Sequence, residues 1–573
     1  MKLLIKEYLA SLRERDELDA ILPDLLSQMG LNVFISPSRG TKEYGVDIAA
    51  VGSIEGGEET VYLFSVKSGN LTRSTWNGSS DQALLPSLDD IIYGFIPSRI
   101  PSEHANKPIE ICLCFGGDIE SKIRQEVSGY TKSRSERNNV TFSEWNGDKL
   151  AEYIEHHLLQ EDFVPEYLRS QLRKSLAMID EPEVSFKHFS HLIHLLTKAG
   201  DRTAKDDLTS IRQLYISLWI LYAWCREENN LESAYLSSES VLLHAWDLSK
   251  SSFGQKNKIP RSIQETLDAI LKLHIEIANH YLEVVVLPYT DKLHALSSAI
   301  NPACPVDTNL KLFDILGRLS MAGIWADWLS TQVTDSNSEA NEKLYAVTHS
   351  YHSSLKQLIT NNPILFSPYK DEQAIDIMLA LYFLGLDGNN QGHINNWLSI
   401  MTDGCYFFFQ TNNTYPSTIE NYAELIEHPV DDTKSYRESV TKGSILYPYI
   451  SVFSAIFGFD QPYRFVQRLK ADFLEHCNFQ VWYPGDSSEE YFYKNDANHG
   501  GTLSDVSIDK EPSDLLKEVF DECDESSQFR ELSAIKYPFW PIIFLACRHY
   551  RQPIPMHFLQ DIHRQVQRSV NVK

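Results

Sequence analysis

The sequence has no long hydrophobic run and none of the common nucleotide-binding or hydrolase motifs. Its longest apolar stretch, residues 214–225 (LYISLWILYAWC), is shorter than the roughly 20 residues needed to span a bilayer, which argues against a membrane protein. Neither GxxxxGK followed by Ser or Thr nor GxGxxG occurs, so nucleotide-driven motor activity is not expected. GxSxG and HExxH are also missing, which argues against the hydrolases and metalloproteases that carry them.

The chain has fewer basic residues than acidic ones. Lys and Arg total 52 against 78 Asp and Glu, which gives a formal net charge of −26. A chain of this sign repels polyphosphate, so nucleic-acid binding through bulk electrostatics is excluded. Any such contact must be local, and we expect it to depend on a basic groove, a metal ion or a partner subunit.

The cysteines and the start of the sequence indicate the compartment. The eight cysteines form no CxxC pair or zinc-like cluster, and we interpret them as reduced, mostly buried thiols. Cys112 and Cys114 alternate on an expected strand and are predicted to lie in the core. The start, MKLLIKEYLASLRERDE, becomes charged after a few apolar residues, which is not typical of a signal peptide. A cytoplasmic protein without membrane contact is predicted.

At 573 residues the chain is too long for one hydrophobic core, so more than one domain is expected. Its first part alternates helical and strand-like patterns. Apolar residues recur with helical spacing over residues 14–28, although Pro23 interrupts that pattern. Strand-like runs rich in β-branched and aromatic residues cover 31–36, 45–51, 61–67, 108–115 and 140–146, and helical segments cover 83–96, 117–139 and 147–158. This order predicts an α/β domain over residues 1–158, with a mixed sheet flanked by helices.

Helical periodicity dominates beyond about residue 160. We therefore predict a large all-α region over residues 159–573, with irregular loops at 385–392 and 495–505. Two helical subdomains and an irregular helical solenoid are both compatible with this pattern, because repeats in such arrays are often weak in sequence.

One group of polar residues in the α/β part fits a single chemistry. Strand alternation puts Ser65 and Lys67 on a common face, and a hairpin between residues 45–51 and 61–67 would bring Asp47 beside Lys67. Phosphodiester hydrolysis needs a carboxylate that holds Mg²⁺ and a cation that stabilises charge or orients the attacking water. The alternative is a surface cross-strand ion pair, worth about 0.5 kcal/mol.

Four successive segments carry a family resemblance. A helix (LDAILPDLLSQMG) with Asp19 comes first, then GVDIAAV, then SVK, and finally a strand, polar turn and helix (FSEWNGDKLAEYI). Over residues 10–155 the chain resembles the PD-(D/E)XK nuclease superfamily, particularly its Mrr-like restriction-endonuclease branch. The resemblance implies that Asp47, Lys67 and Ser65 are catalytic. It also implies that Mg²⁺ or Mn²⁺ is held by Asp47, by the backbone carbonyl of Val66, and by Asp19 or a water bridged through Ser65.

The sequence departs from the family at Ser65, where the family has Glu or Gln. A hydroxyl is a poorer Mg²⁺ ligand than a carboxylate. Glu43, four residues before Asp47, is a further candidate ligand, and the acid could instead have moved to the following helix, at Asp89 or Asp90.

The expected function is a metal-dependent nuclease that hydrolyses DNA, or RNA as the less favoured substrate. By analogy with similar architectures, it would be a bacterial or phage-defence effector regulated by its helical region, which would bind a protein partner or self-assemble. The alternative is an inactive nuclease-fold domain that serves as a nucleic-acid-binding or scaffolding module. A third hypothesis, an enzyme site in the helical region, requires a pocket lined by histidines and carboxylates.

Overall fold

The computed structural model describes the chain except residues 1–5, 7–8, 10–17, 37–43, 55, 79–82, 159–165, 199, 201, 301–303, 334–338, 495–500 and 572–573. Within described helices and strands, the side chains of residues 19, 20, 155, 158, 166–169, 339, 340, 502 and 569–571 also lie outside the described part.

A mixed five-stranded sheet forms the centre of the N-terminal domain. Strands β1 and β2, and β2 and β3, pair antiparallel, whereas β3 pairs parallel with β4 and β4 parallel with β5. The predicted mixed sheet is confirmed. In their order across the sheet, the strands are β1 (Asn32–Ile35), β2 (Ile48–Gly52), β3 (Thr60–Lys67), β4 (Ile109–Phe115) and β5 (Thr141–Trp145).

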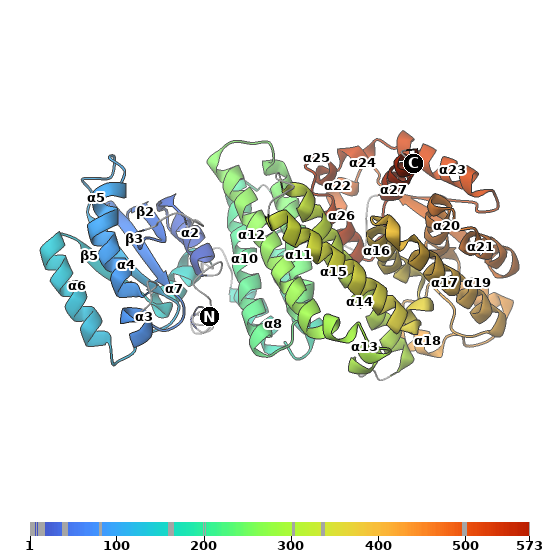
Figure 1. Cartoon of the computed structure of the whole chain (residues 1–573), viewed down its shortest axis with the longest axis horizontal. Helices are drawn as coiled ribbons and strands as arrows, with labels where there is room; N and C mark the ends of the chain where they lie inside the picture. Colours follow the sequence, from blue (N-terminus) through green and yellow to red (C-terminus); the bar gives the residue numbers. More distant parts are fainter. Residues whose placement is uncertain are drawn as a thin grey trace. The chain divides into compact units, whose positions relative to one another are not determined.

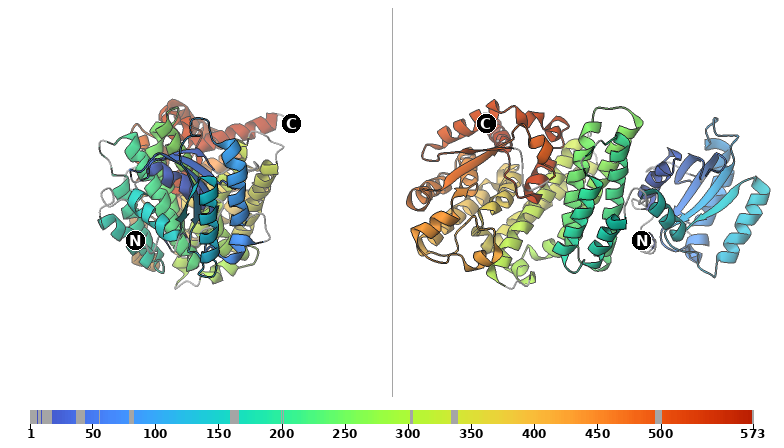
Figure 2. Two further views of the ribbon diagram at one scale, coloured as in Figure 1. Left: turned by 90° about the vertical axis from the view of Figure 1, so that its left-hand side faces the viewer. Right: turned by 180° about the vertical axis from the view of Figure 1, so that it is seen from behind.

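Helices flank this sheet, as the sequence predicts. Figure 1 shows α4 and α6 on one side of the strands and α2 on the other, and the rear view in Figure 2 shows the same layers. The helices of this domain are α2 (Asp19–Gln28), α3 (Arg73–Asn77), α4 (Leu84–Asp90), η2 (Ile91–Phe95), α5 (Ile96–Arg99), α6 (Arg124–Asn138), α7 (Gly147–Tyr153) and η3 (Ile154–Leu158). Helix α2 continues through Pro23 rather than starting there.

The core of the domain explains why β3 is its central strand. Every residue of β3 is buried, as expected for a nearly continuous apolar run with neighbours on both sides. On one face of the sheet, Leu63 and Leu113 pack with Leu84 and Leu88 of α4 and with Val127 of α6. The sheet and the helices of this face are therefore one hydrophobic layer.

From residue 166 onward the described chain is mainly helical, as predicted. The longer helices are α8 (Glu166–Ala177), α9 (Pro182–Leu196), α10 (Ala204–Glu227), α11 (Glu232–Ser249), α12 (Lys258–Tyr281), α14 (Pro305–Gln332), α15 (Glu339–Asn361), α16 (Ala374–Gly385), α17 (Gln391–Thr411), α20 (Leu446–Phe457), α21 (Asp460–Phe473), α23 (Pro512–Glu525), α26 (Pro541–His549) and α27 (His557–Asn571). The shorter ones are η4 (Lys250–Ser252), η5 (Leu282–Val286), η6 (Leu287–Tyr289), α13 (Ala295–Ala299), η7 (Pro363–Phe366), η8 (Asp371–Gln373), η9 (Gly388–Asn390), α18 (Tyr422–Glu427), α19 (Lys434–Val440), α22 (Ser488–Tyr491), α24 (Gln528–Glu531) and α25 (Ser533–Lys536).

Helix α10 shows how the sequence sets these boundaries. The Thr203 hydroxyl accepts the N–H of Asp206, and the Asp206 carboxylate accepts the N–H of Thr203, which forms a capping box. The apolar stretch 214–225 lies inside this helix and is mostly buried. In the described part of the chain no helix is both long and apolar enough to cross a membrane.

Three short strands interrupt the helical region and were not predicted. They are β6 (Gly443–Ser444), β7 (Asn478–Tyr483) and β8 (Thr502–Asp505), in the order β6-β7-β8. The predicted loop at 495–505 is therefore wrong at its end, because the backbone of residues 502–505 pairs antiparallel with β7. This pairing is a tertiary contact, which local composition does not reveal.

The cysteines are all free, as predicted. Cys304 is partly exposed and the other seven are buried. Burial raises the pKa of the Cys112 thiol well above its usual value. A buried thiol of this kind is unreactive, so Cys112 is a core residue.

The chain forms two compact units. The first comprises Met1–Ser237 with Gln255–Ala269, and the second comprises Ser238–Gly254 with Ile270–Lys573. The first unit thus joins the α/β domain to helices α8–α10 and the first half of α12. The two units divide within α11 and α12, and the predicted domain boundary at residue 158 stays a prediction.

Candidate active site at the carboxyl end of strand β3

A tight turn places Asp47 at the start of β2. Gly45 has a φ of +77°, which favours glycine, and a Cβ atom there would lie 2.2 Å from the carbonyl oxygen of Ser87 in α4. After this turn, the backbone N–H of Asp47 donates to the carbonyl of Phe64 at 2.9 Å. The turn packs against α4 and delivers Asp47 to the edge of β3.

The side chain of Asp47 is joined to β3. Its Oδ2 accepts a hydrogen bond from the backbone N–H of Val66 at 2.7 Å. The first paired residue of β2 is Ile48, opposite Phe64, so the side chain of Asp47 supplies an acceptor just before the ladder of β2 begins. The carboxylate therefore lies directly beside the segment Ser65–Lys67.

Ser65 and Lys67 lie at the carboxyl end of β3. They alternate with Val66 and so share a face of the strand, as the sequence predicts. In the parallel register their neighbours on β4 are Leu113 and Phe115. Ser65 is 1% exposed and Lys67 is 7% exposed. An ionisable lysine is rarely buried to this degree without a purpose or a partner.

The Ser65 hydroxyl is an unusual buried group. Its oxygen has no hydrogen-bond partner in the described part of the chain. Leaving a buried polar group unsatisfied costs about 1–3 kcal/mol. A water or a metal ion bound there would satisfy it, so this oxygen is the observation that favours a ligand at the site.

The donor set is composed of oxygen atoms. Asp47 offers a carboxylate, Val66 a backbone carbonyl and Ser65 a hydroxyl, and oxygen ligands suit hard cations such as Mg²⁺ and Mn²⁺. The residues present therefore fit the implied metal, although with one carboxylate. Within the residues that the structure describes, no group of three or more His, Cys, Asp or Glu side chains could hold a metal ion.

The other predicted ligands are placed as follows. Asp19 begins α2, but its side chain lies outside the described part of the chain, and Glu43 lies outside it altogether. Asp89 of α4 accepts from the hydroxyl of Tyr130 at 2.7 Å and from Nη2 of Arg134 at 2.8 Å. It ties α4 to α6, so it is committed to a structural role. Asp90 is exposed.

The negative charge of Asp47 affects the pKa of a thiol on strand β4. Burial raises the pKa of the Cys114 thiol, and the Asp47 carboxylate raises it further. Cys114 pairs with Val66 in the parallel register. The thiol therefore stays protonated and is no nucleophile.

Hydrogen bonds that the sequence did not predict hold the loop after Lys67 in place. The Asn70 side chain accepts the N–H of Asp118 at 2.8 Å, and the Gly69 carbonyl accepts the N–H of Gly117 at 2.9 Å. A Cβ atom on Gly117 would lie 2.1 Å from the Asn70 side chain, so glycine is required for this approach. Lys6 also pairs with Asp118, at 2.9 Å. The ends of β3 and β4 are thereby held together beside Lys67.

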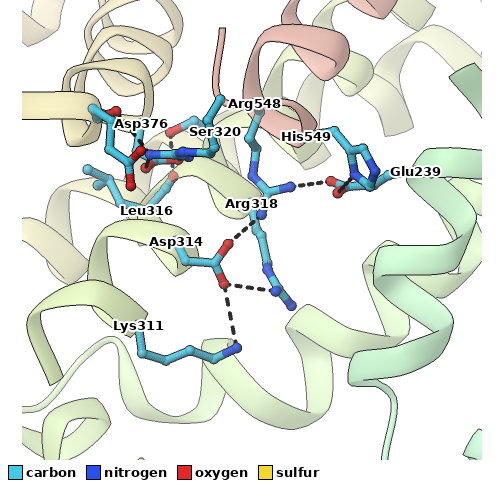
Figure 3. Close-up of polar contacts among 11 residues, drawn as sticks. Glu239, Lys311, Asp314, Leu316, Arg318, Ser320, Asp376, Arg548 and His549 are labelled. Atoms are coloured by element: carbon cyan, nitrogen blue, oxygen red, sulfur yellow. Dashed lines mark hydrogen bonds and ion pairs between the residues drawn. The ribbon is translucent and has the colours of Figure 1, made fainter. Parts of the chain in front are cut away.

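A second cluster of charged residues lies in the core of the second compact unit (Figure 3). Arg548 of α26 pairs with Glu239 of α11, and with Asp314 of α14 at 2.6 Å. Nδ1 of His549 lies 3.0 Å from Glu239, and Arg318 lies 2.8 Å from Asp314. The side chains of Glu239 and Arg548 are 0% and 3% exposed. One buried guanidinium thus joins helices from distant parts of the sequence.

The opposite charges of this cluster neutralise one another. Burial alone would raise the pKa of Glu239, but Arg548 and His549 lower it to about 2. Burial lowers the pKa of the nearby His274 to about 4, and its ring lies 2.9 Å from the Ser238 hydroxyl. Carboxylates and histidines do gather here, as the third hypothesis requires. Glu239 and His549 are buried and bonded to each other, and His274 is buried beside Ser238, which indicates a structural network rather than a substrate site.

The chain matches none of the protein-family models, curated proteins or solved structures with which it was compared.

Proposed function

We propose that the α/β domain is a metal-dependent nuclease with a restriction-endonuclease-like fold, hydrolysing phosphodiester bonds in DNA or, as the less favoured substrate, RNA. The observation that carries the proposal is the carboxylate of Asp47 bonded to the Val66 amide, between the unsatisfied hydroxyl of Ser65 and the buried Lys67. A carboxylate, a carbonyl and a lysine at one strand end supply the groups that the chemistry needs.

Each residue has a role in this proposal. Asp47 and the Val66 carbonyl hold Mg²⁺ or Mn²⁺, and the Ser65 hydroxyl binds the ion directly or through a water. Lys67 orients the attacking water and stabilises negative charge that develops on the phosphate. A bound divalent ion would polarise the phosphate and lower the pKa of a water molecule. Burial of Ser65 and Lys67 strengthens these interactions, because the local dielectric is low.

The biological setting is proposed by analogy. The net charge of −26 disfavours DNA binding by the isolated chain, so a protein partner or self-assembly through the helical region would bring the site to its substrate. We propose a cytoplasmic effector of bacterial or phage defence, regulated by its helical region.

The second candidate is an inactive nucleic-acid-binding or scaffolding module. Two observations favour it. Ser65 stands where the family that the sequence resembles has Glu or Gln, and Oδ2 of Asp47 is engaged by the Val66 amide, which is a structural role.

A cleavage assay separates the two candidates. Plasmid, linear DNA and RNA are incubated with Mg²⁺ or Mn²⁺ and the wild type, Asp47→Ala or Lys67→Ala. Matched controls are Glu136→Gln and Lys122→Ala, exposed residues of the same domain that are outside the site. Cleavage lost only in the two site variants supports the nuclease. If the wild type is inactive with either metal, even alongside its native partners, the inactive module is the better account.

A further inference from the structure

The loops that follow the three parallel strands of the α/β domain are hydrogen-bonded to one another. The N–H of Gly117, after β4, donates to the carbonyl of Gly69, after β3, and the N–H of Gly147, after β5, donates to the carbonyl of Gly117, both at 2.9 Å. Strands β3, β4 and β5 are parallel, so these loops lie at the same end of the sheet as Lys67. One line of hydrogen bonds therefore runs from the loop after Lys67 to the loop after β5.

Asp118 binds the loop after Lys67 through its main chain. Its N–H donates to the Asn70 side chain at 2.8 Å, and its carbonyl accepts the N–H of Leu71 at 3.0 Å. The Leu71 carbonyl in turn accepts the N–H of Glu120 at 3.1 Å. The pairing of β3 with β4 thus continues beyond Lys67, and the position of Asp118 sets the position of this loop.

The side chain of Lys6 bridges the loops after β4 and β5. Its Nζ lies 2.9 Å from Oδ2 of Asp118 and 2.6 Å from Oδ2 of Asp148, which belongs to the first turn of α7. Hydrogen bonds with Asp148 and Asp118 raise the pKa of Lys6, so its ammonium group stays charged. The Lys6 side chain is 24% exposed, whereas both aspartates are about half exposed. One ammonium group therefore holds two carboxylates at the strand ends.

The two carboxylates depend on Lys6 for their closeness. A single exposed ion pair contributes little to stability. Here, however, Asp118 and Asp148 bind the same nitrogen atom, so they lie near each other and repel once that cation is removed. Because Asp118 is also bonded to Asn70 and Leu71, its displacement would loosen the loop after Lys67.

We propose that Lys6 is a positioning residue for Lys67. By holding Asp118 beside Asp148, it fixes the loop that follows Lys67 and so the placement of that lysine at the candidate site. The effect on cleavage rests on the proposed nuclease function, whereas the hold on the loop does not. Placement matters because a displacement of about 1 Å at a reacting group can lower the rate by about 100-fold.

Hydrogen exchange of backbone amides in the full chain measures the hold on the loop. In Lys6→Gln we expect the amides of Gly117 and Asp118 to exchange about threefold faster or more, because their bonds to Gly69 and Asn70 open more often. Lys6→Arg keeps the positive charge and should restore the wild-type exchange rate. Peptides from residues 48–52 and 60–66, in the strands themselves, should exchange as in the wild type.

Lys122→Gln is the matched control. Lys122 is an exposed residue of the same loop after β4, so this variant loses the same charge and keeps the bridge. Its exchange should equal that of the wild type. DNA cleavage is measured in parallel. Lys6→Gln should lower kcat by about fivefold or more and keep KM within about twofold, because Lys67 acts on charge that develops after the substrate has bound. Lys6→Arg should restore kcat.

The outcomes separate the two proposals. Unchanged exchange in Lys6→Gln, or equal acceleration in Lys122→Gln, overturns the positioning role. Faster exchange throughout the domain also overturns it, because Lys6 would then act on stability alone. Faster exchange confined to the loop, with Asp47-dependent cleavage at the wild-type kcat, overturns the link to the reaction. Faster loop exchange that Lys6→Arg reverses supports the hold on the loop, and absence of cleavage in every variant then counts against the nuclease alone.

Discussion

The Asp47 carboxylate accepts the backbone N–H of Val66 at 2.7 Å, so one side chain both completes a strand ladder and faces the candidate metal site. Substitution can separate these two roles. Asp47→Asn keeps an oxygen acceptor for the amide but loses the negative charge. We expect the variant to fold like the wild type and to lose cleavage by on the order of 100-fold or more.

Asp47→Ala removes both roles and so provides the comparison. Loss of the acceptor leaves the Val66 amide unsatisfied, at a cost of about 1–3 kcal/mol in the free energy of unfolding. Urea denaturation and cleavage assays on both variants measure this difference. If Asp47→Asn cleaves DNA normally, the carboxylate does not hold a catalytic metal, and its role is structural.

Ser65 leads to a gain-of-function prediction. Replacing it with Glu introduces a second carboxylate next to Asp47, as the proposed nuclease fold would carry at this position. Two carboxylates bind a hard divalent cation more tightly than one, so we expect Ser65→Glu to raise Mn²⁺ affinity by about tenfold or more, measured by isothermal titration calorimetry. This readout does not depend on catalysis.

Ser53→Glu is the control for added charge, because Ser53 is an exposed residue beyond the end of β2. It should leave Mn²⁺ affinity at the wild-type value. Equal affinities in Ser65→Glu and the wild type would show that the oxygen atoms at this strand end do not form a cation site.

Much of the fold follows from local pattern, and the site residues follow in part. The short apolar runs of β2 and β3 predict the two strands of the hairpin. Ser65 and Lys67 are predicted to share a face, because side-chain direction in a strand has a period of two. No local pattern predicts the Asp47 contact with the Val66 amide, which depends on where β2 begins. The sequence likewise cannot show that β8 pairs with β7, since that contact is made across the fold.

Long-range charge pairs were missed for the same reason. Arg548 meets Glu239 across 309 positions in the chain, and Arg212 meets Asp24 across 188. Each residue alone looks like an ordinary helical surface charge. Their burial is set by how helices pack, which neither composition nor periodicity reports.

The buried network leads to a stability prediction. Glu239→Gln removes a fully buried counter-charge of Arg548, and breaking such a pair costs about 3–5 kcal/mol. Replacing both partners with apolar residues, as in Glu239→Leu/Arg548→Met, should recover part of this loss, because no buried guanidinium is left without its counter-charge and Asp314 keeps Arg318 as a partner.

Urea denaturation of Glu239→Leu, Arg548→Met and the double variant measures the coupling. Glu438→Gln, which breaks the exposed pair with Lys434, is the control and should have little effect. Additive losses in the double variant would mean that Glu239 and Arg548 do not stabilise each other.

His274 contributes to the pH dependence of the second compact unit. Burial lowers its pKa to about 4, while an unfolded histidine titrates near 6.5. The unfolded state therefore binds the proton more readily, so the contribution of His274 to stability is complete above pH 6.5 and is lost as the pH falls through 4. The lowering corresponds to about 3 kcal/mol of stability.

His274→Asn keeps a group that can bond to Ser238 but cannot titrate, so its free energy of unfolding should fall less steeply between pH 6.5 and 4. Urea unfolding at steps across this range measures both slopes, with His294→Asn, at an exposed histidine, as the control. Parallel curves for His274→Asn and the wild type would show that His274 takes up its proton at the same pH in the folded and unfolded chain, so that burial does not lower its pKa.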